Sequence, residues 1–186
     1  MILKGIVLAG GQSRRYGTDK ALALWEGKTF LERSLELLDQ LGLEPEVIAN
    51  ADKDYGFLGR RVHNDLIPGK GPLGGLHTAY TLFPERDFLV LSCDMPLLNR
   101  EVLNLLVERN RTSCGSVVFK SGGLLQPFPG VYTGGLCAWA AKCLEQQQSG
   151  LVDLLSHALD LIALIFPADP IAMSNVNTPE DHRSIE

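Results

Sequence analysis

Short runs of continuous apolar residues alternate along this chain with stretches in which apolar residues recur every three or four positions. The runs at residues 5–9, 46–50 and 88–96 predict β-strands, and the third predicts a central strand covered on both faces because its apolar run is continuous. Between the first two strands, Thr29 and Glu32 form a capping-box signature and Gly42 marks a helix end. The helix between them carries its apolar residues on one face, at Leu31, Leu35, Leu38 and Leu41.

A strand, a helix and a second strand in this order are the unit of a parallel sheet. Further strands are expected at residues 61–65, 116–119, 124–126, 130–132 and 162–166, with the second and third of these paired as a hairpin. Further helices are expected from Pro72 to Phe83, after a cap at Asn99, through Cys137 and Leu144, from Leu151 to Leu159, and after a cap at Thr178. Because no repeat or linker interrupts this order, we expect one domain over residues 1–186.

The first strand runs into paired glycines, Gly10 and Gly11, and then into a cluster of cations at Arg14, Arg15 and Lys20. Glycines let a ligand approach the backbone N–H groups, and the cations favour an anion, so the loop predicts a phosphate site. Paired glycines also occur in simple tight turns, and arginine pairs on solvated surfaces. The spacing matches neither the dinucleotide fingerprint nor the P-loop.

Two other segments point to the same edge of the predicted sheet. The glycine-rich stretch at residues 69–75 precedes a helix that begins at Pro72, and a helix start favours an anion. Asp94 follows the central strand, where open α/β sheets place their ligands, and its carboxylate suits a metal ion. An aspartate before x-Pro can also simply close a turn.

Composition narrows the class of protein. The chain has 186 residues, 45% of them hydrophobic and 21% charged, which is ordinary for a globular protein. Its net charge of −5 argues against a nucleic-acid or anionic-membrane surface. Neither a signal peptide nor a membrane-spanning apolar run is evident, so a cytoplasmic protein is expected. The four cysteines lack Cys-x-x-Cys spacing and are expected to be buried, reduced thiols, and Trp25 and Trp139 are expected in the core.

Four segments taken together resemble the molybdenum cofactor guanylyltransferase family, known as MobA. They occur in the family's order and cover nearly the whole chain, at residues 8–20, 71–76, 93–96 and 175–181. The resemblance implies a three-layer, Rossmann-like nucleotidyltransferase fold of the GT-A type with a mostly parallel sheet. It also implies transfer of GMP from GTP to molybdopterin, with release of pyrophosphate and formation of the molybdopterin guanine dinucleotide cofactor.

The resemblance also implies roles for individual residues. Arg15 is the phosphate-side arginine, Asp94 holds Mg²⁺, and Asn175 and Asn177 lie near the pterin. The nucleotide contacts fall on Leu8, Ala9, Gly10, Gly11, Lys20, Asn50, Asp65 and Asp94. Other proteins of cofactor biosynthesis or delivery are implied as partners.

The chain departs from the family pattern at two positions and leaves rival functions open. Tyr16 replaces the usual methionine beside the phosphate loop, and Gln126 precedes Pro127 where many members have histidine. One rival is a nucleotidyltransferase that uses CTP or a sugar phosphate acceptor, although the cytidylyl enzymes usually carry alanine in place of Gly10. The other is a catalytically silent nucleotide-binding protein, against which Lys20 and Asp94 speak.

Overall fold

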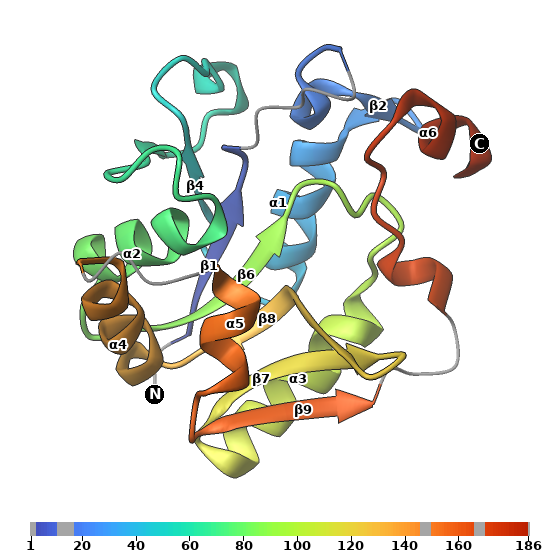
Figure 1. Ribbon diagram of the computed structural model, residues 1–186. Coiled ribbons are helices and arrows are strands. Elements are labelled where there is room, and N and C mark those ends of the chain that lie inside the picture. The colour runs from blue at the N-terminus through green and yellow to red at the C-terminus, as the bar shows by residue number, and fades with distance from the viewer. Residues whose placement is uncertain (1–2, 11–16, 146–149, 166–169, 186) are drawn as a thin grey trace.

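A seven-stranded sheet forms the centre of the molecule, and six of its strands run in the same direction (Figure 1). The computed structural model describes residues 3–10, 17–145, 150–165 and 170–185. The strand order is β5-β4-β1-β6-β8-β7-β9, and β8 is antiparallel to both of its neighbours. The strands are β1 (Leu3–Leu8), β4 (Glu46–Ala49), β5 (Val62–Asn64), β6 (Asp87–Ser92), β7 (Ser116–Ser121), β8 (Leu124–Tyr132) and β9 (Leu161–Ile165). The predicted α/β class with a mostly parallel sheet is confirmed.

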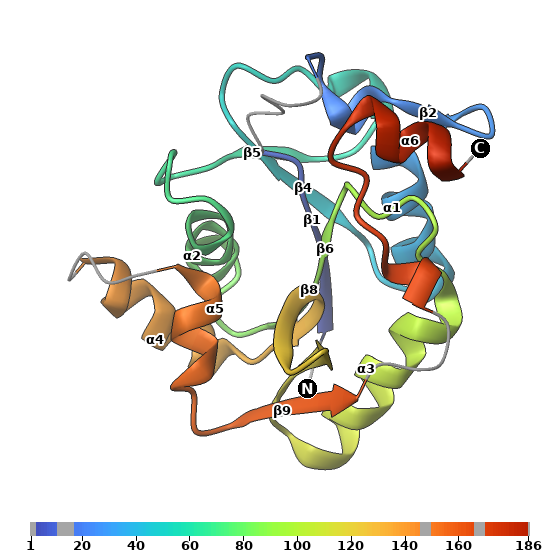
Figure 2. The ribbon, with the colours of Figure 1, turned by 45° about the vertical axis from the view of Figure 1, so that its right-hand side comes forward.

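Helices cover both faces of the sheet and make three layers (Figure 2). On one face lie α1 (Phe30–Gln40) and α3 (Arg100–Ser113), and on the other α2 (Pro72–Leu82), α4 (Gly134–Glu145) and α5 (Leu151–Ser156). The remaining elements are the hairpin of β2 (Leu24–Trp25) and β3 (Lys28–Thr29), the 3-10 helices η1 (Lys20–Leu22), η2 (Gly56–Leu58) and η3 (Pro170–Met173), and the C-terminal helix α6 (Pro179–Ile185). Within the described ranges, no helix is both long and apolar enough to cross a membrane.

The continuous apolar runs arise because the central strands are buried on both faces. In β6, Leu89 and Leu91 pack in the core beneath α1 and α3, whereas Phe88 and Val90 pack in the core beneath α2, α4 and α5. All four side chains are fully buried. The alternation of a strand therefore places apolar side chains on both sides, as the unbroken run in the sequence indicates.

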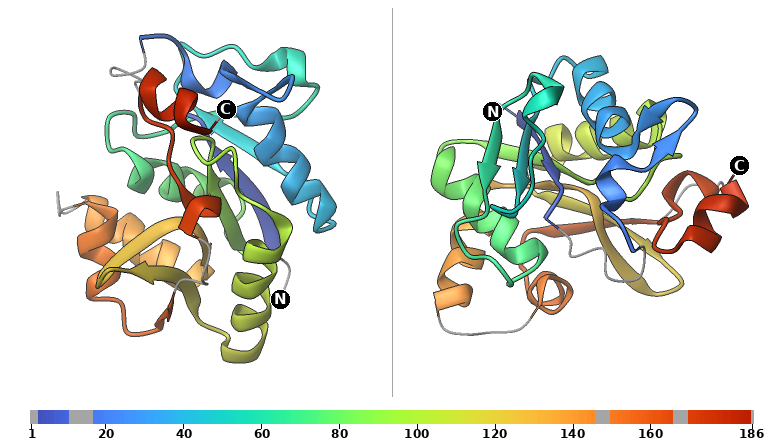
Figure 3. Two further views of the ribbon diagram at one scale, coloured as in Figure 1. Left: turned by 90° about the vertical axis from the view of Figure 1, so that its right-hand side faces the viewer. Right: turned by 90° about the horizontal axis from the view of Figure 1, so that it is seen from above.

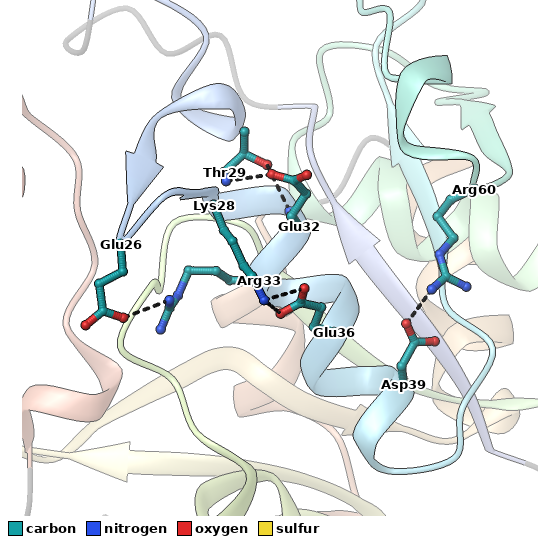
Figure 4. A network of polar contacts seen from close by, with 8 residues as sticks. All are labelled: Glu26, Lys28, Thr29, Glu32, Arg33, Glu36, Asp39 and Arg60. Atoms are coloured by element: carbon teal, nitrogen blue, oxygen red, sulfur yellow. Dashed lines mark hydrogen bonds and ion pairs between the residues drawn. The ribbon is translucent and has the colours of Figure 1, made fainter.

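Helix α1 begins as its sequence predicts. The Thr29 hydroxyl accepts a hydrogen bond from the Glu32 backbone N–H at 3.1 Å, and the Glu32 carboxylate accepts one from the Thr29 backbone N–H at 2.7 Å. Figure 4 shows this box together with ion pairs on the outer face of the helix, among them Lys28 with Glu36 at 2.7 Å. The reciprocal bonds satisfy two donors that a helix start leaves unpaired, which explains why the helix begins here.

Several expectations are wrong in detail. Residues 124–132 form one continuous strand, and the irregularity near the prolines is a bulge in β8, whose residues 127–129 lie between the partners of the adjacent Val118 and Phe119. Helix α5 ends at Ser156 rather than Leu159, whose side chain is fully exposed. Cys114 is a free thiol but exposed, since it caps α3 at a φ of 55°, and Trp139 is 36% exposed rather than in the core.

The register of the parallel strands brings their carboxyl ends to one edge of the sheet. Leu8 pairs with Ser92 of β6 and with Ile48 of β4, and Ala49 pairs with Asn64 of β5. The residues that follow these strands are therefore neighbours, although the sequence separates them widely. The right-hand view of Figure 3 looks onto this edge.

At the opposite edge, a buried carboxylate links three strands. Glu46 pairs with Lys4 at 2.7 Å and with His63, and its side chain is 8% exposed. Burial opposes ionisation, but the contacts with Lys4 and His63 prevail and lower the pKa of Glu46 below its ordinary range. The ionised form is therefore the one that stabilises the fold at neutral pH.

We predict that Glu46→Gln lowers the free energy of unfolding by about 1–3 kcal/mol at pH 7, because the charge-assisted bonds are lost. A carboxyl group whose pKa is lowered by folding stabilises above its unfolded pKa of about 4.3 and loses this effect as the pH falls further. The difference in free energy of unfolding between variant and wild type, measured by urea denaturation, should thus shrink between about pH 5 and about pH 3. Glu36→Gln, which breaks an exposed pair with Lys28, is the control and should cost under about 1 kcal/mol. If the difference in free energy of unfolding between Glu46→Gln and wild type stayed the same at low pH, an ionised Glu46 would not be the stabilising form.

Candidate active site at the carboxyl edge of the sheet

A cavity of about 430 Å³ opens at the carboxyl edge of the sheet. Four of the predicted nucleotide contacts, Leu8, Gly10, Asn50 and Asp65, lie in its wall. The other lining residues are Ile48, Gly69, Gly71, Pro72, Gly75, Ser92 and Phe128. A wider hollow of about 880 Å³ at the opposite edge, between α1 and α3, contains none of the predicted site residues. The smaller cavity is therefore the candidate site.

Asn50 fixes the first glycine of the loop. Its side-chain amide donates a hydrogen bond to the carbonyl oxygen of Gly10 at 2.5 Å. A Cβ atom at position 10 would lie 3.3 Å from the Asn50 Oδ1, so a side chain there would crowd this contact. Asn50 and Gly10, both implied by the resemblance as nucleotide contacts, are thus joined by a hydrogen bond across two adjacent strands.

Asp65 lies across the cavity, at the end of β5. Its Oδ1 accepts hydrogen bonds from the Ile67 backbone N–H at 2.9 Å and from the Thr78 hydroxyl at 3.1 Å. Thr78 is fully buried on α2, and its hydroxyl accepts a further bond from the Leu66 N–H. These contacts hold the carboxylate at a fixed place in the cavity wall.

The glycines of residues 71–75 allow α2 to approach the sheet closely. Gly71 has a φ of 57°, which favours glycine, directly before Pro72 at the first helical turn. A Cβ atom on Gly74 would lie 2.7 Å from the carbonyl oxygen of Ile67 and 3.0 Å from Asp65, and one on Gly75 would lie 2.7 Å from Leu8. Side chains at either position would push into the cavity wall.

Lys20 and Asp94 form an ion pair at the same edge. The Lys20 Nζ donates to Asp94 Oδ2 at 3.0 Å and to Asn177 Oδ1 at 3.0 Å. The Lys20 and Asp94 side chains are 15% and 17% exposed. A cation and a carboxylate that are only partly desolvated remain accessible to a charged ligand. Three predicted residues from distant parts of the chain thus meet in one cluster.

Tyr55 and Lys53, which sequence reasoning missed, contact Asp19, the residue before Lys20. The Tyr55 hydroxyl donates to Asp19 Oδ2 at 2.8 Å and lies 3.4 Å from the carbonyl oxygen of Ala9, and Lys53 pairs with the same Asp19 oxygen at 3.0 Å. A hydroxyl has one proton to donate, and the Tyr55 hydroxyl donates it to the Asp19 carboxylate, which is the nearer and the charged acceptor. Asp19 also caps η1 through the Ala21 N–H at 3.1 Å, so this cluster fixes the residue before Lys20.

Cys93 directly precedes Asp94 in the sequence, but its side chain is buried in the core and its chemistry is that of a packing residue. Burial, together with the Asp94 charge, raises the pKa of its thiol to about 12. The thiol therefore stays protonated at neutral pH, and the thiolate is the nucleophilic form. The site offers charged and hydrogen-bonding groups rather than a side-chain nucleophile at this position.

The remaining predicted site residues fall elsewhere. Gly11 and Arg15, together with the departure at Tyr16, lie outside the described residues. Ala9 is buried in the core and is not part of the cavity wall, and Asn175 is exposed, two residues before Asn177. Gln126 lies on β8 opposite Phe119, whereas Phe128 of the same strand reaches the cavity.

The donor set at Asp94 suits one kind of metal ion. Among the residues that the structure describes, no three His, Cys, Asp or Glu side chains gather into a closed metal cage. Mg²⁺ commonly binds through one or two carboxylates and takes its other ligands from water and substrate phosphates. Asp94 pairs with a cation and follows Ser92 of the cavity wall by two residues, and a single carboxylate in that place fits this pattern of coordination.

Comparison with known proteins agrees with this geometry. Residues 5–161 match the model of the MobA-like NTP transferase domain family. The probable molybdenum cofactor guanylyltransferase of Chloroflexus aggregans is 32% identical, covering 100% of this chain and 94% of that protein, and that of Flavobacterium johnsoniae is 29% identical, covering 96% and 94%. The crystal structure of molybdopterin-guanine dinucleotide biosynthesis protein A from Archaeoglobus fulgidus is 25% identical and superposes with a TM-score of 0.81, covering 98% and 96%.

The match spans the strands and helices that build the cavity, and the fold is the α/β nucleotidyltransferase fold of these neighbours. The chain is an enzyme of that class, and it belongs to the MobA-like NTP transferase domain family.

Proposed function

We propose that this protein transfers GMP from GTP to the terminal phosphate of molybdopterin, which forms molybdopterin guanine dinucleotide and releases pyrophosphate. The observation that carries the proposal is the position of the cavity and the Lys20–Asp94 pair at one edge of the sheet. The names of the relatives, which describe guanylyl transfer in molybdenum cofactor synthesis, support the choice of nucleotide and acceptor.

In this proposal the nucleoside occupies the cavity and the triphosphate extends towards Lys20. The backbone N–H groups of Gly10 and Gly11 bind phosphate oxygens, and Lys20 and Arg15 supply positive charge. Asp94 holds Mg²⁺, which when bound neutralises charge on the phosphates. The hydrogen bonds from Lys20 to Asp94 and Asn177 support a role for Lys20 at the phosphates, because they hold its ammonium group beside the proposed metal ligand.

The transfer itself needs positioning rather than a covalent intermediate. A phosphate oxygen of the acceptor forms a bond to the α-phosphorus of GTP while the bond to the pyrophosphate oxygen breaks. Because both reactants are anions, the cations of the site reduce their repulsion and stabilise the leaving group. Asn175 and Asn177, on the C-terminal side of the site, bind the pterin acceptor in this arrangement.

We further propose that residues 1–186 work as one domain in the cytoplasm, where GTP is available. Seven strands from β1 to β9 share one sheet, and Asn177 near the C-terminus contacts Lys20 near the N-terminus, which supports a single unit. Other proteins of molybdenum cofactor synthesis or delivery are the proposed partners, rather than a nucleic acid or a membrane.

Pyrophosphate release tests the proposed function and separates it from its rivals. The purified protein is incubated with molybdopterin, Mg²⁺ and GTP, CTP or ATP in turn, and the dinucleotide product is identified by mass. We expect release with GTP and formation of the guanine dinucleotide. Release with CTP alone would indicate a cytidylyl enzyme, and tight GTP binding without release would indicate a silent nucleotide-binding protein.

Asp65→Asn tests whether this carboxylate selects guanine. The amide retains Oδ1 for Ile67 and Thr78 but replaces one acceptor oxygen by a donor, which opposes the ring N–H groups of guanine. We expect the preference for GTP over ATP, measured as the ratio of kcat/KM values, to fall about fivefold to tenfold. If turnover with both nucleotides fell equally, Asp65 would support the cavity wall without reading the base.

A further inference from the structure

The segment before α6 reaches the active site from beyond the region that the family model matches. That model ends at residue 161, whereas Val176 and Asn177 contact the candidate catalytic pair. The Val176 backbone N–H donates to the carbonyl oxygen of Asp94 at 2.8 Å, and the Val176 side chain is fully buried. Asn177 Oδ1 accepts from the Lys20 Nζ at 3.0 Å. The C-terminal segment is thus built into the site.

Asp181 fixes the backbone that carries Asn177. Its Oδ2 accepts hydrogen bonds from the backbone N–H groups of Asn177 at 2.8 Å and Thr178 at 2.9 Å, while the Thr178 hydroxyl accepts from the Asp181 N–H at 3.1 Å. The bond from Asn177 is the main reason that the pKa of Asp181 is lowered, so the carboxylate is ionised at neutral pH. Charge-assisted bonds of this kind hold both backbone groups in one conformation.

The helix that carries Asp181 is in turn fixed to the body of the protein. The His182 ring packs edge-on against Phe30 with 5.2 Å between ring centroids, and its centroid lies 6.5 Å from that of Trp25. These residues belong to the start of α1 and to the β2–β3 hairpin, and the views in Figures 1 and 2 place α6 beside them. Asn177 is therefore held between two anchored points, Val176 and Asp181.

We propose that Asp181 is a positioning residue, which acts through Asn177 to hold the Lys20 ammonium group where the triphosphate meets it. This inference rests on the proposed function. Among the acceptors of Lys20, Asp94 is charged whereas the amide of Asn177 is neutral. If Asp94 bound Mg²⁺, its carboxylate would hold Lys20 less tightly, whereas the Asn177 amide oxygen would continue to orient Lys20 without neutralising its charge.

The neighbouring Glu180 provides a matched control. It lies in the same first turn of α6 and carries the same charge, but its carboxylate pairs with Arg183 at 2.6 Å on the surface. Glu180→Ala and Asp181→Ala remove the same charge at adjacent positions, and only the second removes the contacts to Asn177. Because Asp181 also interacts electrostatically with Lys20, Asp181→Asn separates the loss of charge from the loss of those contacts. Circular dichroism at the assay temperature verifies that each variant is folded.

We expect Asp181→Ala to reduce kcat/KM for GTP about tenfold and to weaken GTP binding in calorimetry by a similar factor, with Glu180→Ala within about twofold of wild type. Asp181→Asn, which keeps an acceptor oxygen, should recover part of the loss. In a Lys20→Met background, Asp181→Ala should cause no further loss, because the group that it positions is gone.

Three of four outcomes would overturn the inference, and the other would overturn the proposed function alone. A folded Asp181→Ala variant with wild-type kinetics and GTP affinity would leave Asp181 as a helix cap alone. Equal losses in the Lys20 and Lys20→Met backgrounds would show that Asp181 acts by another route. If wild type bound GTP but released no pyrophosphate, the proposed function would fail while the calorimetric comparison still decided the role of Asp181. A wild-type chain that bound no nucleoside triphosphate would overturn both.

Discussion

Replacing Asp94 by asparagine is expected to reduce guanylyl transfer by at least about 100-fold while the protein remains folded. The substitution keeps the size of the side chain but removes the charge that a magnesium ligand needs, and metal ions contribute several kcal/mol to reactions of phosphates. It also leaves the Lys20 ammonium group, 15% exposed, without its carboxylate partner. Asn177 still accepts from Lys20, so the structural cost should stay near about 1–3 kcal/mol.

Pyrophosphate release at saturating GTP and molybdopterin measures the effect of Asp94→Asn. Calorimetric titration of GTP with and without Mg²⁺ provides a second readout, in which the variant should lose the metal-dependent part of the binding. Glu101→Gln, which removes an exposed carboxylate from the first turn of α3, is the control for loss of a charge and should behave as wild type. Wild-type turnover by Asp94→Asn at ordinary Mg²⁺ concentrations would exclude Asp94 from the mechanism.

The sequence predicts best those elements whose cause is local. The capping box of Thr29 and Glu32 starts α1, Asn99 caps α3 through the Val102 N–H, and Pro72 begins α2. In each case the residues that make the stabilising contact lie within one helical turn of each other, so their spacing is visible in the chain. The buried strands are equally visible, because burial on both faces requires an unbroken apolar run.

Elements whose cause is distant are predicted less well. The continuous strand β8 includes Pro127 and Pro129, which read as breaks, yet it pairs with β7 on both sides of a bulge at residues 127–129. Helix α5 ends early at Ser156, although leucines continue to Leu159. In both cases the outcome depends on neighbouring elements, which a sequence pattern does not contain.

In the candidate site, too, some features can be predicted from the sequence and others depend on distant contacts. Strand ends in a parallel sheet meet at one edge, so the approach of Gly10, Asn50, Asp65 and Asp94 follows from topology once the strands are assigned. The hydrogen bonds and ion pairs that fix these groups cannot be deduced from the topology. Tyr55 appears in a polar stretch with no periodic pattern, yet it is 1% exposed and bonds to Asp19 across 36 positions of sequence. The bond between Lys20 and Asn177 spans 157 positions.

Gly74→Ala should both destabilise the protein and weaken GTP binding tenfold or more, if Asp65 reads the base. In an ordinary helix this change would stabilise by up to about 1 kcal/mol. Here the new Cβ would lie 2.7 Å from the carbonyl oxygen of Ile67, a backbone atom, and 3.0 Å from the Asp65 carboxylate. Overpacking of this kind costs about 1–3 kcal/mol and would displace Asp65 from the cavity wall.

Gly135→Ala is the matched control, because Gly135 also lies in the first turn of a helix but has no atom nearer than 3.9 Å to a new Cβ. Thermal unfolding should show a lower Tm for Gly74→Ala and an unchanged or higher Tm for Gly135→Ala, and GTP titration should show weaker binding for the first variant alone. A Gly74→Ala protein as stable as wild type, with equal GTP affinity, would mean that α2 can move away from the sheet without disturbing the nucleotide. The close approach of α2 would then be a packing feature, and the guanine contact would have to come from Asn50 or the backbone near Leu8.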